Sequence, residues 1–417
     1  MMMSDISAQA SQTLAFKSVS QLCDIKYSIV GDGGYVVSLL ALIQSTHGNL
    51  PKRIYVNQFT QDLPAELQVL EEELANTQEA VLVLGTSLFQ LEMLTRITKI
   101  ACGDPLFVDV LAAKGNEETL GYYQTNVPKN RPYVMFIAVN PHDNIRHYLG
   151  SFFSRLDECK IDVVIRHPLQ HISDQVLLSA SGVLIWNGSM SIHQPILRKI
   201  KNLNLDITFV ECGFFPQSEY FYFDKVGVND QSQLQMDDLH WVGDEHKNAL
   251  EIVRRAFYLD ASPYPDSNYI FVPLQVPNDS NILNNSRFTS GMQEFIDFIE
   301  QKYVDQKIIF KAHPKDRMKS HYRLKHGVFS EADSRSLIMG AKLVHGINSS
   351  VLYEAALAKK TVIAEGNCLL NTISAPTESI LAAMVARQHN VHQRFFDTQK
   401  LHRFSHFKGT LDTALVK

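Results

Sequence analysis

The sequence predicts an α/β fold in which two Rossmann-like domains face a cleft. Short apolar runs of strand length alternate with helical patterns, which is typical of a parallel sheet covered on both faces. Many of these runs end in a polar or glycine-containing turn, and one proline-containing segment divides the chain. The 417 residues suffice for about two or three domains.

The first domain is expected over 13–258, and it carries most of the alternating segments. Its candidate strands are 53–57, 79–84, 133–139, 161–165, 182–186 and 206–210. Helical patterns occupy 65–75, 144–159, 173–180 and 194–202. Ligands bind outside the carboxyl ends of strands in such sheets, so functional residues are expected in the turns that follow them. These turns are 140–143, 166–168, 187–188 and 211–213.

The segment 259–268 is expected to be a linker, because its two prolines and its small polar residues disfavour both helix and strand. A second α/β domain is expected over 269–376. Its candidate strands are 269–274, 308–311, 343–345 and 361–364, separated by helical patterns at 290–302, 334–339 and 351–359. The tail, 377–417, begins with a helical pattern and is expected to pack back on the first domain.

Composition and charge exclude several classes of protein. A net charge of −5 and the lack of a long basic run argue against a nucleic-acid binder. The five cysteines are scattered without CxxC spacing, which predicts reduced thiols rather than a disulfide framework or a zinc site. The sequence shows no signal-peptide pattern and no stretch of ~20 apolar residues. We expect a cytoplasmic protein, and peripheral attachment to a membrane stays open.

Two strand ends in the last third carry the clearest chemistry. The run 308–311 ends in Lys311 and is followed by His313, and the run 343–345 is followed by Asn348, Ser349 and Ser350. Asn348 or Ser349 is a good helix N-cap, and the free N–H groups and dipole of a helix start attract phosphate. His313 could donate to the same phosphate. The pattern predicts a nucleotide or nucleotide-sugar site.

Other polar residues follow expected strands at positions that would line a ligand crevice. Gln275, Asp279 and Ser280 come directly after the strand that ends at Leu274, at a switch-point position. Glu211 ends a strand just before Gly213, which would let the backbone approach a ligand closely.

Asp224 and Asp230 flank a turn, and each alone is more typical of a structural turn residue than of a catalytic one. The segment 31–34 is glycine-rich but lacks the GxGxxG order of a dinucleotide site. No spacing indicates a metal site, and Ser349 lacks the flanking glycines of a hydrolase elbow.

Taken in order, these elements resemble the bacterial β-Kdo transferases of capsule and O-antigen assembly, which use CMP-Kdo. The resemblance covers roughly 183–367. It rests on five elements, namely 211–213, 224–229, 273–275 with 279–280, 311–314, and 348–350 with 354–355. Cys212 departs from the family, which often has an acidic residue or Asn there.

The resemblance implies a GT-B-like glycosyltransferase that moves Kdo from CMP-Kdo to a sugar acceptor of a bacterial surface polysaccharide. The acceptor would belong to O-antigen, capsule or its lipid linker, and the enzyme would work at the inner face of the inner membrane or in an assembly complex. The family retains anomeric configuration, which implies double displacement through an Asp-linked glycosyl intermediate. No metal and no tightly bound cofactor are implied; CMP would be the product.

The resemblance also implies roles for single residues. His313, Ser349 and Ser350 would hold the CMP phosphate, and Glu354 would face the ribose or fix the helix. The nucleotide cleft would be lined by Gln275, Asp279 and Ser280, with Lys311 and Asn348 beside it. Glu211 would act at the reacting carbon or on the acceptor hydroxyl. Asp224 is the first choice for the nucleophile and Asp230 the second.

Three alternatives stay open. A CMP-sialic acid transferase would invert configuration, so it would need a base but neither Asp224 nor Asp230 as nucleophile. A nucleotide-sugar epimerase of similar fold would turn over its donor without an acceptor. A non-catalytic nucleotide- or glycan-binding module would show no turnover, and carboxylate substitutions would leave its affinity largely unchanged.

Overall fold

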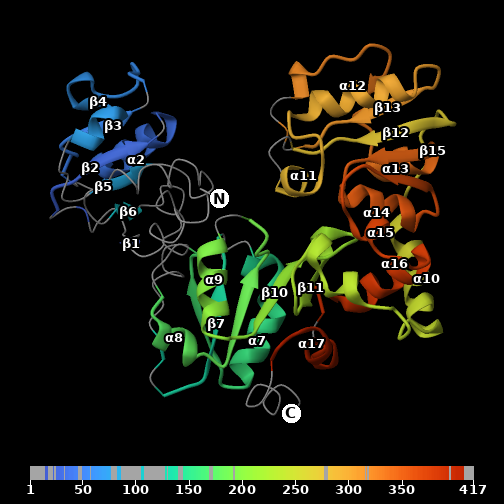
Figure 1. Ribbon diagram of the computed structural model, residues 1–417, viewed down its shortest axis with the longest axis horizontal. Helices are drawn as coiled ribbons and strands as arrows, with labels where there is room; N and C mark the ends of the chain where they lie inside the picture. Colours follow the sequence, from blue (N-terminus) through green and yellow to red (C-terminus); the bar gives the residue numbers. More distant parts are fainter. Residues whose placement is uncertain are drawn as a thin grey trace. The chain divides into compact units, whose positions relative to one another are not determined.

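The computed structural model divides the chain into two compact units, residues Met1–Thr208 with His406–Lys417, and Phe209–Ser405 (Figure 1). The residues that it describes are 15–16, 22, 25–31, 33–45, 49–56, 58–76, 82–85, 105–107, 127–128, 130–139, 144–168, 172–190, 193–276, 280–314, 316, 319–393 and 396–407. The segment 259–268 lies inside the second unit. The domain bounds that the sequence suggested stay predictions.

The first unit begins with a sheet whose paired strands all run parallel, in the order β1-β6-β5-β2-β3-β4. Its strands are β1 (Ala15–Phe16), β2 (Ser28–Gly31), β3 (Ile54–Val56), β4 (Gln68–Leu70), β5 (Leu82–Gly85) and β6 (Pro105–Phe107). Helix α2 (Gly33–Ser45) packs Val36, Leu39 and Ile43 against Ile29 and Ile54. Short 3-10 helices, η2 (Ala65–Leu67) and η3 (Glu71–Asn76), flank β4.

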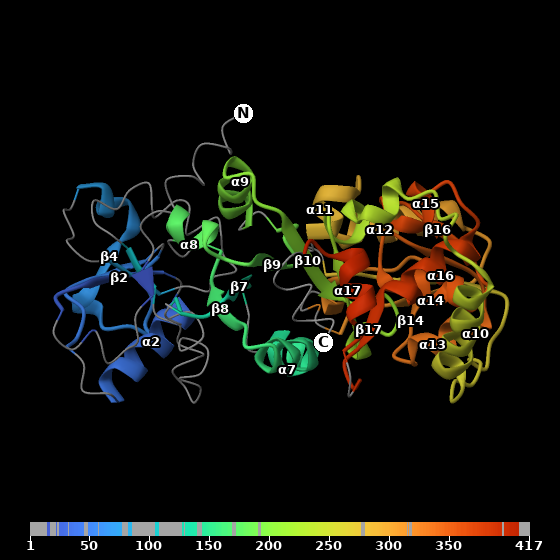
Figure 2. The ribbon, with the colours of Figure 1, turned by 90° about the horizontal axis from the view of Figure 1, so that it is seen from below.

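A second sheet contains β8 (Asp162–Arg166), β7 (Tyr133–Ile137), β9 (Gly182–Trp186) and β10 (Ile207–Cys212), in that spatial order. β7 is parallel to both β8 and β9. Helix α7 (Gly150–Glu158) covers one face, and α8 (Asp174–Leu178) and α9 (Gln194–Asn202) cover the other (Figure 2). A π-helical turn, η4 (Asn144–Leu149), precedes α7. The division between the units falls within β10.

In the second unit, the end of β10 pairs antiparallel with β11 (Tyr220–Asp224), which pairs antiparallel with β17 (Gln388–Asn390). The remaining elements around them are η6 (Gln217–Glu219), η7 (Asn229–Gln231), η8 (Gln233–Met236), α10 (Asp244–Tyr258), α16 (Thr377–Arg387) and α17 (Thr398–Phe404). The helix expected at the start of the tail is therefore present as α16, and β17 follows it directly.

The third sheet has five parallel strands in the order β14-β13-β12-β15-β16. They are β12 (Tyr269–Pro273), β13 (Ile308–Lys311), β14 (Val328–Phe329), β15 (Ala341–Gly346) and β16 (Thr361–Ala364). The helices of this region are α11 (Ser280–Asn285), α12 (Met292–Lys302), α13 (Ser334–Gly340), α14 (Ser350–Leu357) and α15 (Leu369–Thr372), with a short η9 (Lys319–His321). The expected α/β class with parallel sheets is confirmed.

Alternation along β12 explains why helices cover both faces of this sheet. Ile270 and Val272 pack with α12, whereas Tyr269 and Phe271 pack with α13 and α14. Successive side chains of a strand point to opposite faces, so a fully apolar strand needs a cover on each side. Figure 1 shows α12 on one side of the strands and α13 with α14 on the other. Within the described ranges, no helix is both long and apolar enough to cross a membrane.

Candidate functional site

The strand order of the third sheet places a topological switch point between β12 and β15. The chain leaves β12 toward α11 and α12 on one face, and it leaves β15 toward α14 on the other. Ligands of open α/β sheets bind outside the strand ends at such a point. The third sheet therefore offers a ligand crevice beyond the carboxyl ends of these two strands.

Two residues predicted for the nucleotide cleft meet at this switch point. Gln275 follows β12 and Asn348 follows β15. The Gln275 Nε2 donates to Asn348 Oδ1 at 3.0 Å, and the Asn348 backbone N–H donates to Gln275 Oε1 at 3.2 Å. Each amide thus fixes the other across the two strand ends, so the first turn of α14 is held in place beside them.

Ser349 is the N-cap of α14, as the sequence predicted for Asn348 or Ser349. Its Oγ accepts from the Val351 backbone N–H at 3.3 Å. A hydroxyl that accepts one hydrogen bond still has its own O–H to donate. Ser350 is the first residue of the helix. The start of α14 therefore presents N–H groups and hydroxyls at the crevice, a combination that suits an anion.

Lys311 and His313 lie at the end of the neighbouring strand β13, which is paired in parallel with β12. The Lys311 ammonium donates to the Ala332 carbonyl at 2.7 Å, so it ties β13 to the segment before α13. His313 is partly exposed, and its backbone carbonyl accepts from the Asp316 N–H at 2.9 Å. β13 and β15 flank β12, so their ends are about 10 Å apart at the same edge.

Gly366 closes this edge after β16, and sequence reasoning missed it. Its N–H donates to the Ile347 carbonyl at 2.9 Å. A Cβ on Gly366 would lie 2.9 Å from the Asn285 carbonyl oxygen and 3.1 Å from Asn348 Nδ2. Only glycine fits between α11 and the Asn348 amide without displacing one of them. The signal in the sequence was a glycine two residues past an expected strand.

Asp230 lies close to this edge. Its side chain hydrogen-bonds Asn285, the last residue of α11. Burial raises the pKa of the Asp230 carboxyl, and the bond to Asn285 opposes that shift. The charge of Asp230 also contributes to the raised pKa values of Tyr353 and Cys368, for which burial is the main cause. Asp230 is thus a partly buried carboxylate whose partner, Asn285, lies beside Gly366.

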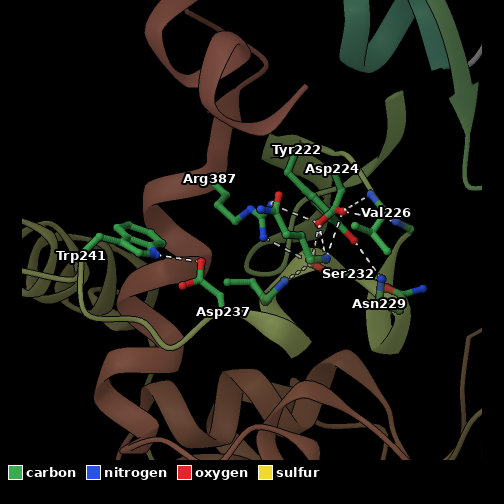
Figure 3. A network of polar contacts seen from close by, with 11 residues as sticks. Tyr222, Asp224, Val226, Asn229, Ser232, Asp237, Trp241 and Arg387 are labelled. Atoms are coloured by element: carbon green, nitrogen blue, oxygen red, sulfur yellow. Dashed lines mark hydrogen bonds and ion pairs between the residues drawn. The ribbon is translucent and has the colours of Figure 1, made fainter. Parts of the chain in front are cut away.

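Asp224, the first choice for a nucleophile, has a different environment (Figure 3). It is 0 % exposed, and its Oδ2 lies 3.1 Å from Nη2 of Arg387, which is itself 1 % exposed. Its oxygens accept from Ser232 Oγ at 2.5 Å and from the backbone N–H groups of Val226, Gly227 and Gln233. Neither oxygen is available to a sugar in this geometry. Of the two aspartates, Asp230 is the more accessible to a ligand.

Glu211 is 9 % exposed and sits on β10 opposite Tyr222 of β11. Its Oε1 accepts from the Cys212 backbone N–H at 2.8 Å. Burial raises the pKa of the Tyr222 hydroxyl well above its usual value, and the charge of Glu211 adds to that shift. Glu211 therefore lies in a poorly solvated environment between β10 and β11.

Gly213 has a different role from the one that the sequence suggested. We expected it to let the backbone approach a ligand. A Cβ on Gly213 would instead lie 2.4 Å from the Tyr220 Cβ, and the Gly213 N–H donates to the Tyr220 carbonyl at 2.6 Å. The glycine permits close pairing of β10 with β11, which is a packing role.

Two predicted residues can be placed only in part. Asp279 lies outside the described residues. Ser280 is the first residue of α11, and only its backbone is described. Among the described residues, no three metal-binding side chains cluster.

Glu354 lies one turn into α14 and faces a pocket rather than the Gln275–Asn348 pair. The pocket also contains Asp333 and Arg335 at the start of α13. Burial raises the pKa of the Glu354 carboxyl to about 7; Asp333 adds to the shift and Arg335 opposes it. The expected ribose contact of Glu354 stays a prediction.

Residues 262–406 match the family model of the capsule polysaccharide biosynthesis proteins. The expected resemblance to capsule-assembly proteins is confirmed over this stretch. The match contains Gln275, His313, Ser349 and Glu354, and it excludes the candidate carboxylates before residue 262.

Similarity to individual proteins was found as well. The chain is 26 % identical to Protein FixF of Sinorhizobium fredii over 230 residues, which is 51 % of this chain and 53 % of FixF. The chain thus matches about half the length of that curated relative. Among solved structures, the β-Kdo 2,7 transferase of Thermosulfurimonas dismutans KpsC aligns with a TM-score of 0.42 and 17 % identity, over 60 % of this chain and 89 % of that one. The β-Kdo 2,4 transferase of the same KpsC aligns with a TM-score of 0.45 and 15 % identity, over 62 % and 91 %.

Proposed function

We propose that this protein is a glycosyltransferase that moves Kdo from CMP-Kdo to a sugar acceptor of a bacterial surface polysaccharide. The observation that carries the proposal is the reciprocal pairing of Gln275 and Asn348 at the switch point, beside the start of α14. The family match over 262–406 supports it, because that stretch holds the whole edge of the third sheet.

The nucleotide phosphate of the donor would bind at the start of α14. The free N–H groups of the helix and the hydroxyls of Ser349 and Ser350 would face it, and His313 would donate from the end of β13. When the bond between the anomeric carbon and the CMP phosphate breaks, negative charge grows on the phosphate. Preorganised donors around that charge stabilise the transition state more than the ground state.

Retention of configuration requires a carboxylate that bonds to the anomeric carbon as CMP leaves. The acceptor hydroxyl then displaces that carboxylate and gives its proton to a base. We assign the nucleophile to Asp230, because its hydrogen bond to Asn285 places it near the sheet edge, whereas Asp224 is enclosed. Glu211 is the proposed base. Asp279 follows β12 in the sequence and belongs in the test set.

The experiment has two parts on one sample. Calorimetry compares CMP with UMP, GMP and ADP, and intact mass is then recorded after incubation with CMP-Kdo. We expect selective CMP binding and a covalent gain of one Kdo that is lost in Asp230→Asn. Matched variants are Asp279→Asn and Glu211→Gln, each checked for an unchanged unfolding midpoint.

Each outcome has a defined meaning. An adduct lost only in Asp279→Asn moves the nucleophile to that residue and contradicts the role of Asp230. CMP binding with turnover but no adduct contradicts double displacement. A lack of preference for CMP over the other nucleotides overturns the proposed donor.

A further inference from the structure

The second unit contains a pocket of about 500 Å³ between α10, α13 and α14. Its wall is built from α10, the start of α13, the outer side of α14 and the turn before β11. The lining residues that matter here are Glu219, Tyr220, Phe257, Asp333, Arg335 and Glu354. Neither Gln275 nor Asn348 lines it. A volume of this size lies within the range of small-molecule sites.

The Glu354 side chain is a polar group of the pocket without a hydrogen-bond partner in the described part of the chain. Its backbone carbonyl accepts from the Tyr258 hydroxyl at 2.8 Å, but its carboxyl forms no hydrogen bond with any described residue. With a pKa raised to about 7 by burial, the carboxyl is protonated in a sizeable fraction of molecules at neutral pH. It can then donate as well as accept a hydrogen bond.

The charges around the pocket disfavour an anion. Arg335 is the one cation among the lining residues, and its Nε lies 3.4 Å from Asp333 Oδ2. Its Nη1 donates to the Phe257 carbonyl at 3.1 Å, so the guanidinium is held in place. Glu219 adds negative charge, and so does Glu354 in the molecules in which it is ionised. A phosphate or a sugar carboxylate would be repelled from this lining.

The apolar part of the lining includes two aromatic residues. Tyr220 and Phe257 lie on the pocket wall together with Val253, Ala256 and Val351. A sugar ring combines an apolar C–H face with a rim of hydroxyls that both donate and accept. Aromatic surface beside carboxyl groups matches both parts, since rings cover the C–H face and carboxyls bond the hydroxyls.

We propose that this pocket binds a neutral, hydroxyl-rich sugar residue of a glycan. That this glycan is the acceptor rests on the proposed transferase function. That the pocket binds a neutral sugar is independent of that function. The unpartnered Glu354 carboxyl bonds the sugar hydroxyls, and the Tyr220 and Phe257 side chains flank the ring.

The test is saturation-transfer NMR with the methyl glycosides of glucose, galactose, rhamnose and N-acetylglucosamine. Free Kdo is the anionic probe and putrescine the cationic one. We expect transfer to at least one neutral glycoside and to neither charged probe. Glu354→Ala should weaken that binding at least fivefold, whereas Glu354→Gln, which keeps a donor and an acceptor, should largely retain it.

Two further variants test whether the binding site is the pocket. Glu219 is exposed, so Glu219→Ala should fold normally and still weaken glycoside binding. Glu245→Gln, on the exposed first turn of α10, is the matched control and should change nothing. Putrescine binding that disappears in Glu354→Gln would identify a cation site instead. Failure of every neutral glycoside to bind, or preference for Kdo, would overturn the proposal.

CMP calorimetry on Glu219→Ala separates this inference from the proposed function. Glu219 is not among the residues expected at the nucleotide, so this variant should keep the affinity for CMP. Glycoside binding without CMP binding would leave the pocket assignment intact and remove the transferase proposal. CMP binding without any glycoside binding would overturn the pocket assignment and leave the transferase proposal intact.

Discussion

Single residues at the edge of the third sheet carry the proposed donor chemistry, and His313 is the simplest to test. His313→Ala should raise the dissociation constant for CMP about tenfold or more, because a charge-assisted hydrogen bond contributes ~1.5–3 kcal/mol. Calorimetry measures this directly. His321→Ala, at an exposed position of η9, is the matched control. Unchanged CMP affinity in a folded His313→Ala protein would remove this residue from the site.

Substitution of Asp224 should destabilise the protein much more than substitution of Asp230. Asp224→Ala leaves the buried Arg387 guanidinium without its counter-ion, and breaking a buried pair costs about 3–5 kcal/mol. Asp230→Ala removes a partly buried group that hydrogen-bonds the Asn285 side chain on α11, and it should cost far less. Urea unfolding followed by fluorescence compares them. Equal destabilisation by both would contradict the structural role of Asp224.

At the scale of elements, Glu300 joins α12 to the turn before β14. It is 0 % exposed and accepts from the backbone N–H groups of Lys325, His326 and Gly327 at 2.8–3.0 Å. Gly327 suits this turn because a Cβ there would lie 2.4 Å from the Phe310 ring. One buried carboxylate therefore accepts from three backbone N–H groups of a partly exposed turn.

Glu300→Ala should lower the free energy of unfolding by about 3 kcal/mol, because three backbone N–H groups lose a charged acceptor. Burial opposes ionisation, but the three N–H groups outweigh it and lower the pKa of Glu300. Its stabilisation is therefore present above the unfolded pKa near 4.5 and is lost as pH falls below it. Urea midpoints at several pH values measure both effects, with exposed Asp305→Ala as the control. A midpoint equal to that of the control would show that the turn holds without Glu300.

The elements also show how far the sequence could lead. The apolar runs at 269–274, 308–311 and 361–364 became β12, β13 and β16, because a buried parallel strand needs a continuous apolar run. The Ser349 cap was visible because it depends on adjacent residues. β17 was missed because its sequence, Gln-His-Asn, has no strand signature, and its pairing with β11 alone makes it a strand.

The part of the candidate site that lies at strand ends was predictable from the sequence. Strand-end residues such as Gln275 and Asn348 could be expected to converge, since parallel strands share one carboxyl edge. The enclosure of Asp224 could not be foreseen, because its counter-ion Arg387 lies on α16, far along the chain. The role of Gly213 was misassigned because its neighbour Tyr220 sits across a strand pair.

At the scale of the whole molecule, buried imidazoles make stability depend on pH. Burial lowers the pKa of His193 to about 4 and those of His167 and His389 well below 6.5. The unfolded chain therefore binds protons between pH 6.5 and 4 that the folded chain does not, so stability falls on acidification through this range. For His193 the loss amounts to at most about 3 kcal/mol.

Urea midpoints recorded from pH 7 to pH 4 test this dependence. His193→Leu removes one titrating group and should flatten the decline. The exposed His240→Leu, whose side chain is 88 % exposed, should leave the profile unchanged. Equal slopes in all three proteins would mean that other groups govern the acid response.

The pairing of β11 with β17 has a consequence for how the protein is made. Ribosomes release a chain from its N-terminus, so β11, an aromatic-rich strand, emerges well before residues 388–390 are synthesised. During that interval its outer edge is uncovered and Asp224 has no counter-ion, because Arg387 has not yet been added. Such an edge invites association with other nascent chains. This protein should therefore rely on chaperones until residues 388–390 leave the ribosome, and slow translation between the two strands should lower its yield.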